Sequence, residues 1–266
     1  MTISFNVDRT DDEERINERM REGGLSAPAA SPWIREDFAR AWTAGDVQAD
    51  FLAVPRRIAA TIVSLDRPGA RLIADVGSGP GDFLAVFLAQ FPAARGVWSD
   101  VSSAMRGIAE ERLAALGDRV EYVAADMSDI GALPAGLDAL VTSRALHHLD
   151  PDGLRAVYAE AAAHLAPGGW LINLDHVTIG RGWDARLRAA RTELLPPKPE
   201  STATAHHHDA PPPAIDDHLA GLREAGFADI DIPWRGFHTC LFVARKADAA
   251  PLDPAPLDPA PQNESA

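Results

Sequence analysis

Three glycines at alternate positions, Gly77, Gly79 and Gly81, are the feature that most constrains how this chain can fold. They follow the mainly apolar residues 72–76, which are typical of a buried parallel strand, and they precede an apolar helical pattern that opens at residue 82. Glycine allows a tight turn and lets the backbone approach a ligand without an intervening Cβ. The sequence therefore predicts a strand, a glycine turn and a helix, an arrangement typical of nucleotide binding.

Dinucleotide-dependent dehydrogenases are the nearest alternative, and the residues disfavour them. Such enzymes need Gly-x-Gly-x-x-Gly, so that a pyrophosphate can sit on a helix N-terminus, whereas the third glycine of this chain comes one residue earlier. Asp75 places a carboxylate beside the turn, where it would repel a pyrophosphate and attract an ammonium group. The charge favours a ligand with a cationic end.

A second acid follows the next predicted strand. Asp100 comes after residues 96–99, roughly 20 residues beyond the glycines, which is the spacing at which a carboxylate can accept hydrogen bonds from both hydroxyls of a ribose. The alternative is that Asp100 caps the helix that follows it. We interpret Asp100 as a ribose ligand because of its place in the series.

The order of these motifs resembles that of the class I S-adenosylmethionine-dependent methyltransferases. A third short strand at 120–123 leads to Asp126, a fourth at 137–143 leads to Arg144 and His147, and a glycine-containing turn at 167–169 opens a fifth strand. The resemblance is strong over about residues 55–176 and looser as far as 245. It implies a Rossmann-like, doubly wound sheet of seven strands whose last strand is antiparallel, with ligands at the carboxyl ends of the strands.

The resemblance also implies a cofactor site for S-adenosylmethionine, with Asp126 accepting from the adenine amino group. The same resemblance implies that Met127 packs on the adenine, and the alternative is that this methionine is part of the hydrophobic core. The residues implied to bind the cofactor are Asp75, Gly77, Ser78, Gly79, Gly81, Asp100, Val101, Asp126, Met127 and Ser143.

Catalysis in that family is direct displacement, in which a nucleophilic O, N, S or C atom attacks the activated methyl group. His147 is the candidate base, because a histidine titrates near neutral pH, and His148 is a second candidate. Plant O-methyltransferases carry His-Asp-Trp here, and this chain matches only the histidine, so a packing role is the alternative. We assign Arg144, His176 and Trp183 to a small-molecule substrate, although Arg144 could instead pair with a surface acid.

The flanks predict a cap, an insertion and a tail around the central domain of residues 55–246. Residues 1–54 show helical patterns near 11–21 and 33–42 and form the expected N-terminal helical cap, while Pro55 predicts a helix start. Residues 177–214 form an insertion after strand five that is expected to cap the substrate. Residues 247–266 are Pro-rich and acidic, which predicts a disordered tail.

Histidines 206–208 lie inside the insertion and allow two interpretations, a metal cluster or a polar loop. Adjacent histidines rarely converge on one ion without partners from elsewhere, so we expect no metal.

Composition limits the partners. The net charge of −14 and the absence of any basic run argue against nucleic acid, and no apolar stretch is long enough to cross a membrane. The single cysteine, Cys240, excludes a disulfide framework, and the first ten residues lack the basic and apolar regions of a signal peptide, so we expect a cytoplasmic protein. A homodimer is left open. The alternative functions are a cofactor-binding protein without methyl transfer and, less favoured, an enzyme of tRNA modification.

Overall fold

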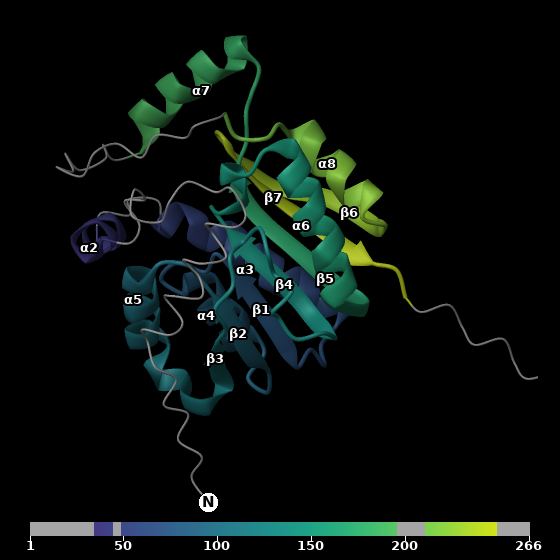
Figure 1. Ribbon diagram of the computed structural model, residues 1–266. Coiled ribbons are helices and arrows are strands. Elements are labelled where there is room, and N and C mark those ends of the chain that lie inside the picture. Colours follow the sequence, from purple (N-terminus) through teal and green to yellow (C-terminus); the bar gives the residue numbers. More distant parts are fainter. Residues whose placement is uncertain (1–34, 45–48, 196–210, 249–266) are drawn as a thin grey trace, which may run out of the picture.

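A seven-stranded mixed sheet forms the centre of the protein, in a computed structural model that describes residues 35–44, 49–195 and 211–248 (Figure 1). The strand order is β3-β2-β1-β4-β5-β7-β6, and β7 alone runs antiparallel to its neighbours β5 and β6. The strands are β1 (Leu72–Val76), β2 (Arg95–Ser99), β3 (Val120–Tyr122), β4 (Leu137–Ser143), β5 (Leu165–His176), β6 (Phe227–Gly236) and β7 (Thr239–Lys246). The predicted doubly wound sheet with an antiparallel last strand is confirmed.

Helices cover both faces of this sheet (Figure 1). The first face is covered by α3 (Ala49–Asp66), α4 (Asp82–Gln90) and α5 (Ser103–Leu113), and the second by α6 (Pro151–His164) and α8 (Ile215–Glu224). Because side chains alternate along a strand, Ile73 packs into the first core and Ala74 into the second. Burial on both faces explains why the central strands are almost continuously apolar.

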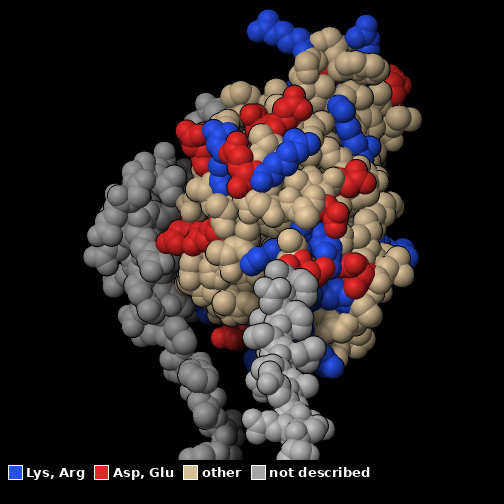
Figure 2. Space-filling model, turned by 90° about the vertical axis from the view of Figure 1, so that its right-hand side faces the viewer, with Lys and Arg blue, Asp and Glu red and all other residues tan. Residues whose placement is uncertain are grey.

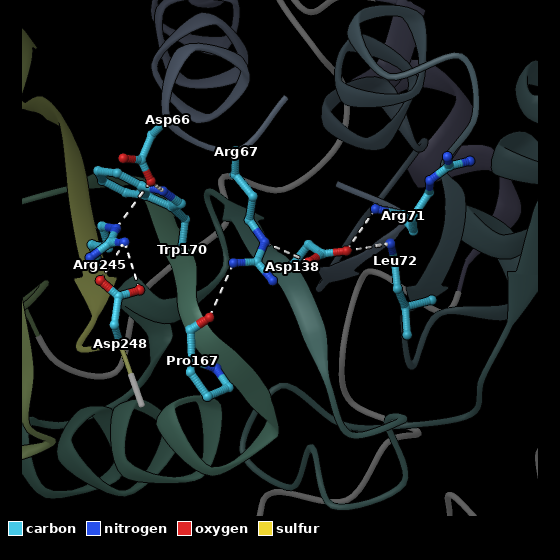
Figure 3. Close-up of polar contacts among 9 residues, drawn as sticks. All are labelled: Asp66, Arg67, Arg71, Leu72, Asp138, Pro167, Trp170, Arg245 and Asp248. Carbon is cyan, nitrogen blue, oxygen red and sulfur yellow. Dashed lines mark hydrogen bonds and ion pairs between the residues drawn. The ribbon is translucent and has the colours of Figure 1, made fainter. Parts of the chain in front are cut away.

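Two clusters of polar side chains stabilise the edge of the sheet at which the parallel strands begin. Asp138 accepts hydrogen bonds from Arg67 Nε at 2.5 Å and from the backbone nitrogens of Arg71 and Leu72 at 2.6 and 3.0 Å (Figure 3). Burial alone would raise the pKa of Asp138, but these hydrogen bonds outweigh it and hold the pKa below its ordinary value. They join the chain before β1 to the start of β4.

The second cluster joins α3 to the last strand. Asp66 accepts from the indole nitrogen of Trp170 at 2.9 Å and from Arg245 Nε at 3.0 Å, and Arg245 also contacts Asp248 (Figure 3). Both clusters lie at the amino ends of the parallel strands, whereas the glycine turn lies at their carboxyl ends. The clusters therefore stabilise the fold, and the carboxyl edge of the sheet is left for ligands.

The N-terminal helices differ from the prediction in one respect. The helix α2 (Glu36–Ala44) packs Ala39 against Met105 and Ile108 of α5, where the sequence pattern predicts a helix near 33–42. The pattern near 11–21 lies outside the described residues. The expected helix start at Pro55 is wrong, because α3 begins at Ala49 and Pro55 lies inside it. The helix starts before Pro55 because Leu52 is fully buried. The free energy gained by packing Leu52 offsets the loss of the one backbone hydrogen bond that the proline cannot donate.

The insertion after β5 leaves the body of the protein through a narrow stem. Thr178 donates its backbone N–H to the carbonyl of Pro213 at 3.1 Å and its hydroxyl to that of Pro212 at 2.5 Å, which holds the two ends of the insertion together. From this stem projects α7 (Arg181–Leu194), which stands away from the sheet in Figure 1 and has no buried residue. A further link to the body is a contact of 2.8 Å between Asp184 and His238.

Candidate active site

The glycine turn joins β1 to α4 and packs under the segment that follows β4. All three glycines have positive φ angles, +59° at Gly77, +53° at Gly79 and +82° at Gly81, which L side chains rarely adopt. A Cβ on Gly77 would lie 2.6 Å from the Cβ of Ala145, whereas a Cβ on Gly79 would meet nothing within 4 Å. The first position thus requires glycine for close packing, and the second leaves open space beside the turn.

Asp75 supports the turn from beneath. Its Oδ2 accepts hydrogen bonds from Ser78 Oγ at 3.0 Å and from the backbone nitrogen of Leu84 at 3.1 Å, while Oδ1 has no partner among the described residues. Burial raises the pKa of this fully enclosed carboxyl to about 7, and the two hydrogen bonds only partly oppose the rise. The structure therefore shows Asp75 positioning the turn, and its expected contact with an ammonium group stays a prediction.

Asp100 lies beside the turn, at the end of β2. Its Oδ2 accepts from the backbone nitrogen of Gly79 at 2.8 Å, and its Oδ1 accepts from that of Ser102 at 2.8 Å. Burial raises the pKa of Asp100 to about 6 despite these two bonds. Each oxygen keeps a further lone pair, so the carboxylate can hold the turn and still accept hydrogen bonds from a ligand.

The other predicted cofactor residues follow the ends of neighbouring strands. Asp126 is half-buried and accepts from both the backbone nitrogen and the hydroxyl of Ser128, and Met127 lies next to it near the turn. Val101 follows Asp100, and Ser143, the last residue of β4, has a buried hydroxyl without a partner among the described residues.

His147 forms a buried pair with Asp175, a residue that the sequence analysis did not select. His147 lies in the short helix η4 (Leu146–His148) after β4, and Asp175 is the penultimate residue of β5. The ring Nδ1 of His147 lies 2.6 Å from Asp175 Oδ1, and its backbone nitrogen donates to Asp175 Oδ2 at 2.9 Å. Burial alone would raise the pKa of Asp175, but the charge and hydrogen bond of His147, with His176 adding to them, hold it far below its ordinary value.

Two more histidines surround this pair. The ring centroids of His148 and His176 lie 4.2 and 5.1 Å from that of His147, and His176 Nδ1 lies 3.1 Å from Thr239 Oγ1. Arg144, at the end of β4, has a φ of +55°, a strained value for a non-glycine residue, and its backbone nitrogen donates to the carbonyl of Leu174. Arg144 and the three histidines therefore lie at the carboxyl ends of β4 and β5.

Trp183 is placed differently from the rest of the predicted substrate contacts. It lies on α7, is 62% exposed, and has the guanidinium of Arg186 5.7 Å from its ring centroid. Within the described part of the chain, no group of three His, Cys, Asp or Glu residues is placed to hold a metal ion, and histidines 206–208 lie outside that part. Among the described helices, none combines the length and apolar character needed to cross a membrane.

Comparison with known proteins finds relatives of the central part of the chain. A family model described as a methyltransferase domain matches residues 73–169. A 3-amino-4-hydroxybenzoate 4-O-methyltransferase of Streptomyces cremeus is 34% identical over 119 residues, which is 44% of this chain and 32% of that protein. A release factor glutamine methyltransferase of Xylella fastidiosa is 28% identical over 175 residues, or 54% of this chain and 60% of that one.

Solved structures agree with the fold. The crystal structure of a protein described as an O-methyltransferase from Nostoc punctiforme superposes with a TM-score of 0.62 at 18% identity, and covers 89% of this chain and 69% of that one. This chain thus spans between a third and three fifths of the length of the two curated relatives above. Residues 73–169 thus match a methyltransferase domain, and the fold around them is the Rossmann-like fold of S-adenosylmethionine-dependent methyltransferases.

The residues at the glycine turn fit the cofactor of that class. Gly79 leaves open space on the ligand side, Asp100 keeps lone pairs for ribose hydroxyls, and the hydroxyl of Ser143 is enclosed without a partner among the described residues. These are donor and acceptor groups of the kind that a nucleoside with a cationic amino-acid end requires.

Proposed function

We propose that this protein transfers a methyl group from S-adenosylmethionine to a hydroxyl oxygen of a small molecule. The observation that carries the proposal is the buried pair of His147 and Asp175 at the carboxyl ends of β4 and β5. A hydroxyl is a weak nucleophile until its proton is removed, so a positioned base is what separates oxygen methylation from simple cofactor binding.

The cofactor supplies a methyl group already activated on a sulfonium, and the protein has to supply alignment and a proton acceptor. Asp175 accepts the Nδ1 proton of His147, which leaves the lone pair of the neutral ring on Nε2. That nitrogen takes the proton of the attacking hydroxyl as the new O–C bond forms, and Asp175 stabilises the resulting imidazolium. Hydrogen bonds from His147 and from the backbone nitrogen of His176 favour the ionised form of Asp175 throughout.

The substrate that we infer is a hydroxylated aromatic acid. The Streptomyces cremeus relative is named for a hydroxybenzoate, which combines a phenol with a carboxylate. Arg144, next to the histidines, has the charge to bind such a carboxylate, while His148 and His176 offer flat ring surfaces near His147.

Charge and cysteine content support a cytoplasmic enzyme of small molecules. On the face shown in Figure 2, blue Lys and Arg side chains alternate with red Asp and Glu, and the described residues there form no continuous basic surface. The only thiol, Cys240, is fully buried in β7. We therefore propose that neither nucleic acid nor a membrane is a partner.

The test is formation of S-adenosylhomocysteine with a panel of phenolic acids, the same acids blocked as methyl ethers, and a glutamine-containing peptide. We expect turnover with free phenols only, and a loss of roughly 100-fold or more in kcat for His147→Ala with unchanged binding of S-adenosylhomocysteine. His164→Ala, in a half-buried histidine at the end of α6, is the matched control and should keep the wild-type rate. Turnover of the peptide but not of the phenols, or a His147→Ala variant at full rate, would contradict the proposal.

A further inference from the structure

The helix α7 carries an apolar stripe whose two end residues are exposed and whose two middle residues are half-buried. Trp183, Leu187, Ala190 and Leu194 are spaced by four, three and four residues, so they lie on one side of the helix. Trp183 is 62% exposed and Leu194 is 72% exposed, and the two rank among the most exposed large apolar side chains in the described part of the chain. Helices pair through apolar stripes with this spacing, and we call the stripe of Trp183, Leu187, Ala190 and Leu194 the seam.

The charged residues beside the seam are complementary to a second copy of the same helix. Arg186 and Glu193 flank one side of the stripe, and Asp184 and Arg191 flank the other. If two copies of α7 lie antiparallel about a two-fold axis near residue 188, each Arg186 faces Glu193 of the other copy, and each Asp184 faces the other Arg191. In this alignment each positively charged side chain beside the stripe faces a negatively charged side chain of the other copy.

The apolar residues fit the same alignment. It places Trp183 opposite Leu194 and Leu187 opposite Ala190, so a large side chain meets a smaller one at each level. A parallel pairing would instead bring the two tryptophans together and oppose like charges. A single antiparallel register therefore matches both the sizes of the apolar side chains and the signs of the charged side chains.

Asp184 and Arg191 are both partly engaged within one copy of the chain. The Nη2 of Arg191 is enclosed and has no hydrogen-bond partner among the described residues. Asp184 is held by Arg188 and His238, whose hydrogen bonds lower its pKa and keep it ionised. A carboxylate can accept from more than one donor, so Asp184 of a second copy can still bind Arg191 through a guanidinium nitrogen other than the enclosed Nη2.

We propose that α7 is a dimerisation helix, which pairs antiparallel with α7 of a second copy of this chain through Trp183, Leu187, Ala190 and Leu194. A helix of 14 residues is only about 21 Å long, so this seam alone makes a concentration-dependent dimer rather than a permanent one. The pairing is independent of the proposed methyl transfer and would stand if that function were wrong.

Charge reversal tests the proposal directly by sedimentation equilibrium of the full chain. Arg186→Glu places a second carboxylate against Glu193 of the other copy, and Glu193→Arg places two guanidinium groups together, so each variant alone should dimerise about 10-fold or more weakly than wild type. An equimolar mixture of the two variants restores opposite charges at both contacts. We expect the mixture to regain the wild-type dimer as a heterodimer.

A matched control separates this seam from general surface effects. Leu65→Glu changes an apolar side chain on α3 that is 80% exposed, and it should leave association unchanged. Circular dichroism and thermal unfolding confirm that each variant is folded, which we expect because α7 buries no residue. A monomer at all concentrations, a dimer indifferent to Arg186→Glu, or a mixture that stays monomeric would each overturn the proposal.

Discussion

Tyr158 on α6 and His218 on α8 are joined by a buried hydrogen bond of 2.7 Å between the phenol oxygen and the ring Nδ1. Asn173 on β5 donates to the same phenol oxygen at 3.0 Å, so one hydroxyl connects two helices to the sheet. Burial lowers the pKa of His218 to about 4, which keeps the ring neutral and able to accept the proton of Tyr158.

Replacement of Tyr158 by phenylalanine should lower the free energy of unfolding by about 2–4 kcal/mol, because it leaves two buried polar groups without a partner. Urea titration at neutral pH measures the change. Tyr122→Phe removes a single, half-buried hydrogen bond to the carbonyl of Asp100 and should cost about 1 kcal/mol. Equal losses in the two variants would show that the hydroxyl of Tyr158 has no special role.

Gly77→Ala should be far more damaging than Gly79→Ala. Both positions have positive φ angles, so both variants carry backbone strain of about 1–2 kcal/mol, but only the alanine at 77 also meets Ala145 at 2.6 Å. Thermal unfolding should therefore show a larger loss at 77. The alanine at 79 projects into the open space beside the turn, so its effect should appear in the affinity for S-adenosylhomocysteine, measured by calorimetry. The reverse order of stabilities would contradict the geometry of the turn.

Asp175→Asn should lower kcat by about 100-fold or more and leave binding of S-adenosylhomocysteine within a few-fold of wild type. The amide can donate to Nδ1 of His147, which moves the ring proton to Nε2, the nitrogen that has to act as the base. Asp152→Asn, in a carboxylate exposed at the start of α6, is the control and should be fully active. An Asp175→Asn enzyme within about threefold of wild type at pH 7 would exclude the pair from catalysis.

Asp75 predicts a pH dependence of stability. Its pKa is about 7 in the folded protein and about 4 in an unfolded chain, so between these values the folded state holds a proton that the unfolded state has released. The contribution of Asp75 to stability is thus full below about pH 4 and is lost as the pH rises through 7, a change of about 4 kcal/mol. Asp75→Asn cannot titrate and keeps an oxygen acceptor for Leu84. The stability of wild type relative to this variant should therefore fall from pH 5 to pH 8 in urea titrations, and a constant difference would show that Asp75 is ionised throughout.

The sequence predicted the sheet and the glycine turn because both depend on local patterns. The glycine turn with Gly77 and Gly79 follows one continuous apolar strand, and Asp100 follows the next. Their proximity can therefore be deduced from the order of the strands, as the hydrogen bond between Gly79 and Asp100 shows. Asp175 was missed because its importance lies in a contact with a residue 28 positions away, across two strands. An acid next to His176, at the end of a predicted central strand, was the signal that could have found it.

The sequence patterns also did not predict the surroundings of individual side chains. The charge of Asp75 predicted a contact with an ammonium group, which stays a prediction, but it did not predict the hydrogen bonds by which Asp75 supports the turn and α4. The apolar character of Trp183 predicted a substrate contact, which stays a prediction, but it did not predict that the side chain is exposed on α7. In both cases the surroundings of the side chain depend on tertiary packing, which a local sequence pattern does not contain.

The bonds of Thr178 to Pro212 and Pro213 make the insertion separable from the rest of the chain. Since its two ends are already held together, the loop between them can change length or sequence at little entropic cost to the sheet. Residues 179–211 are therefore a segment that evolution, or a protein engineer, can exchange for another while the sheet and the glycine turn stay unchanged. Such an exchange would replace the apolar stripe of α7 in the same event, so a new specificity and a new state of assembly could arise together.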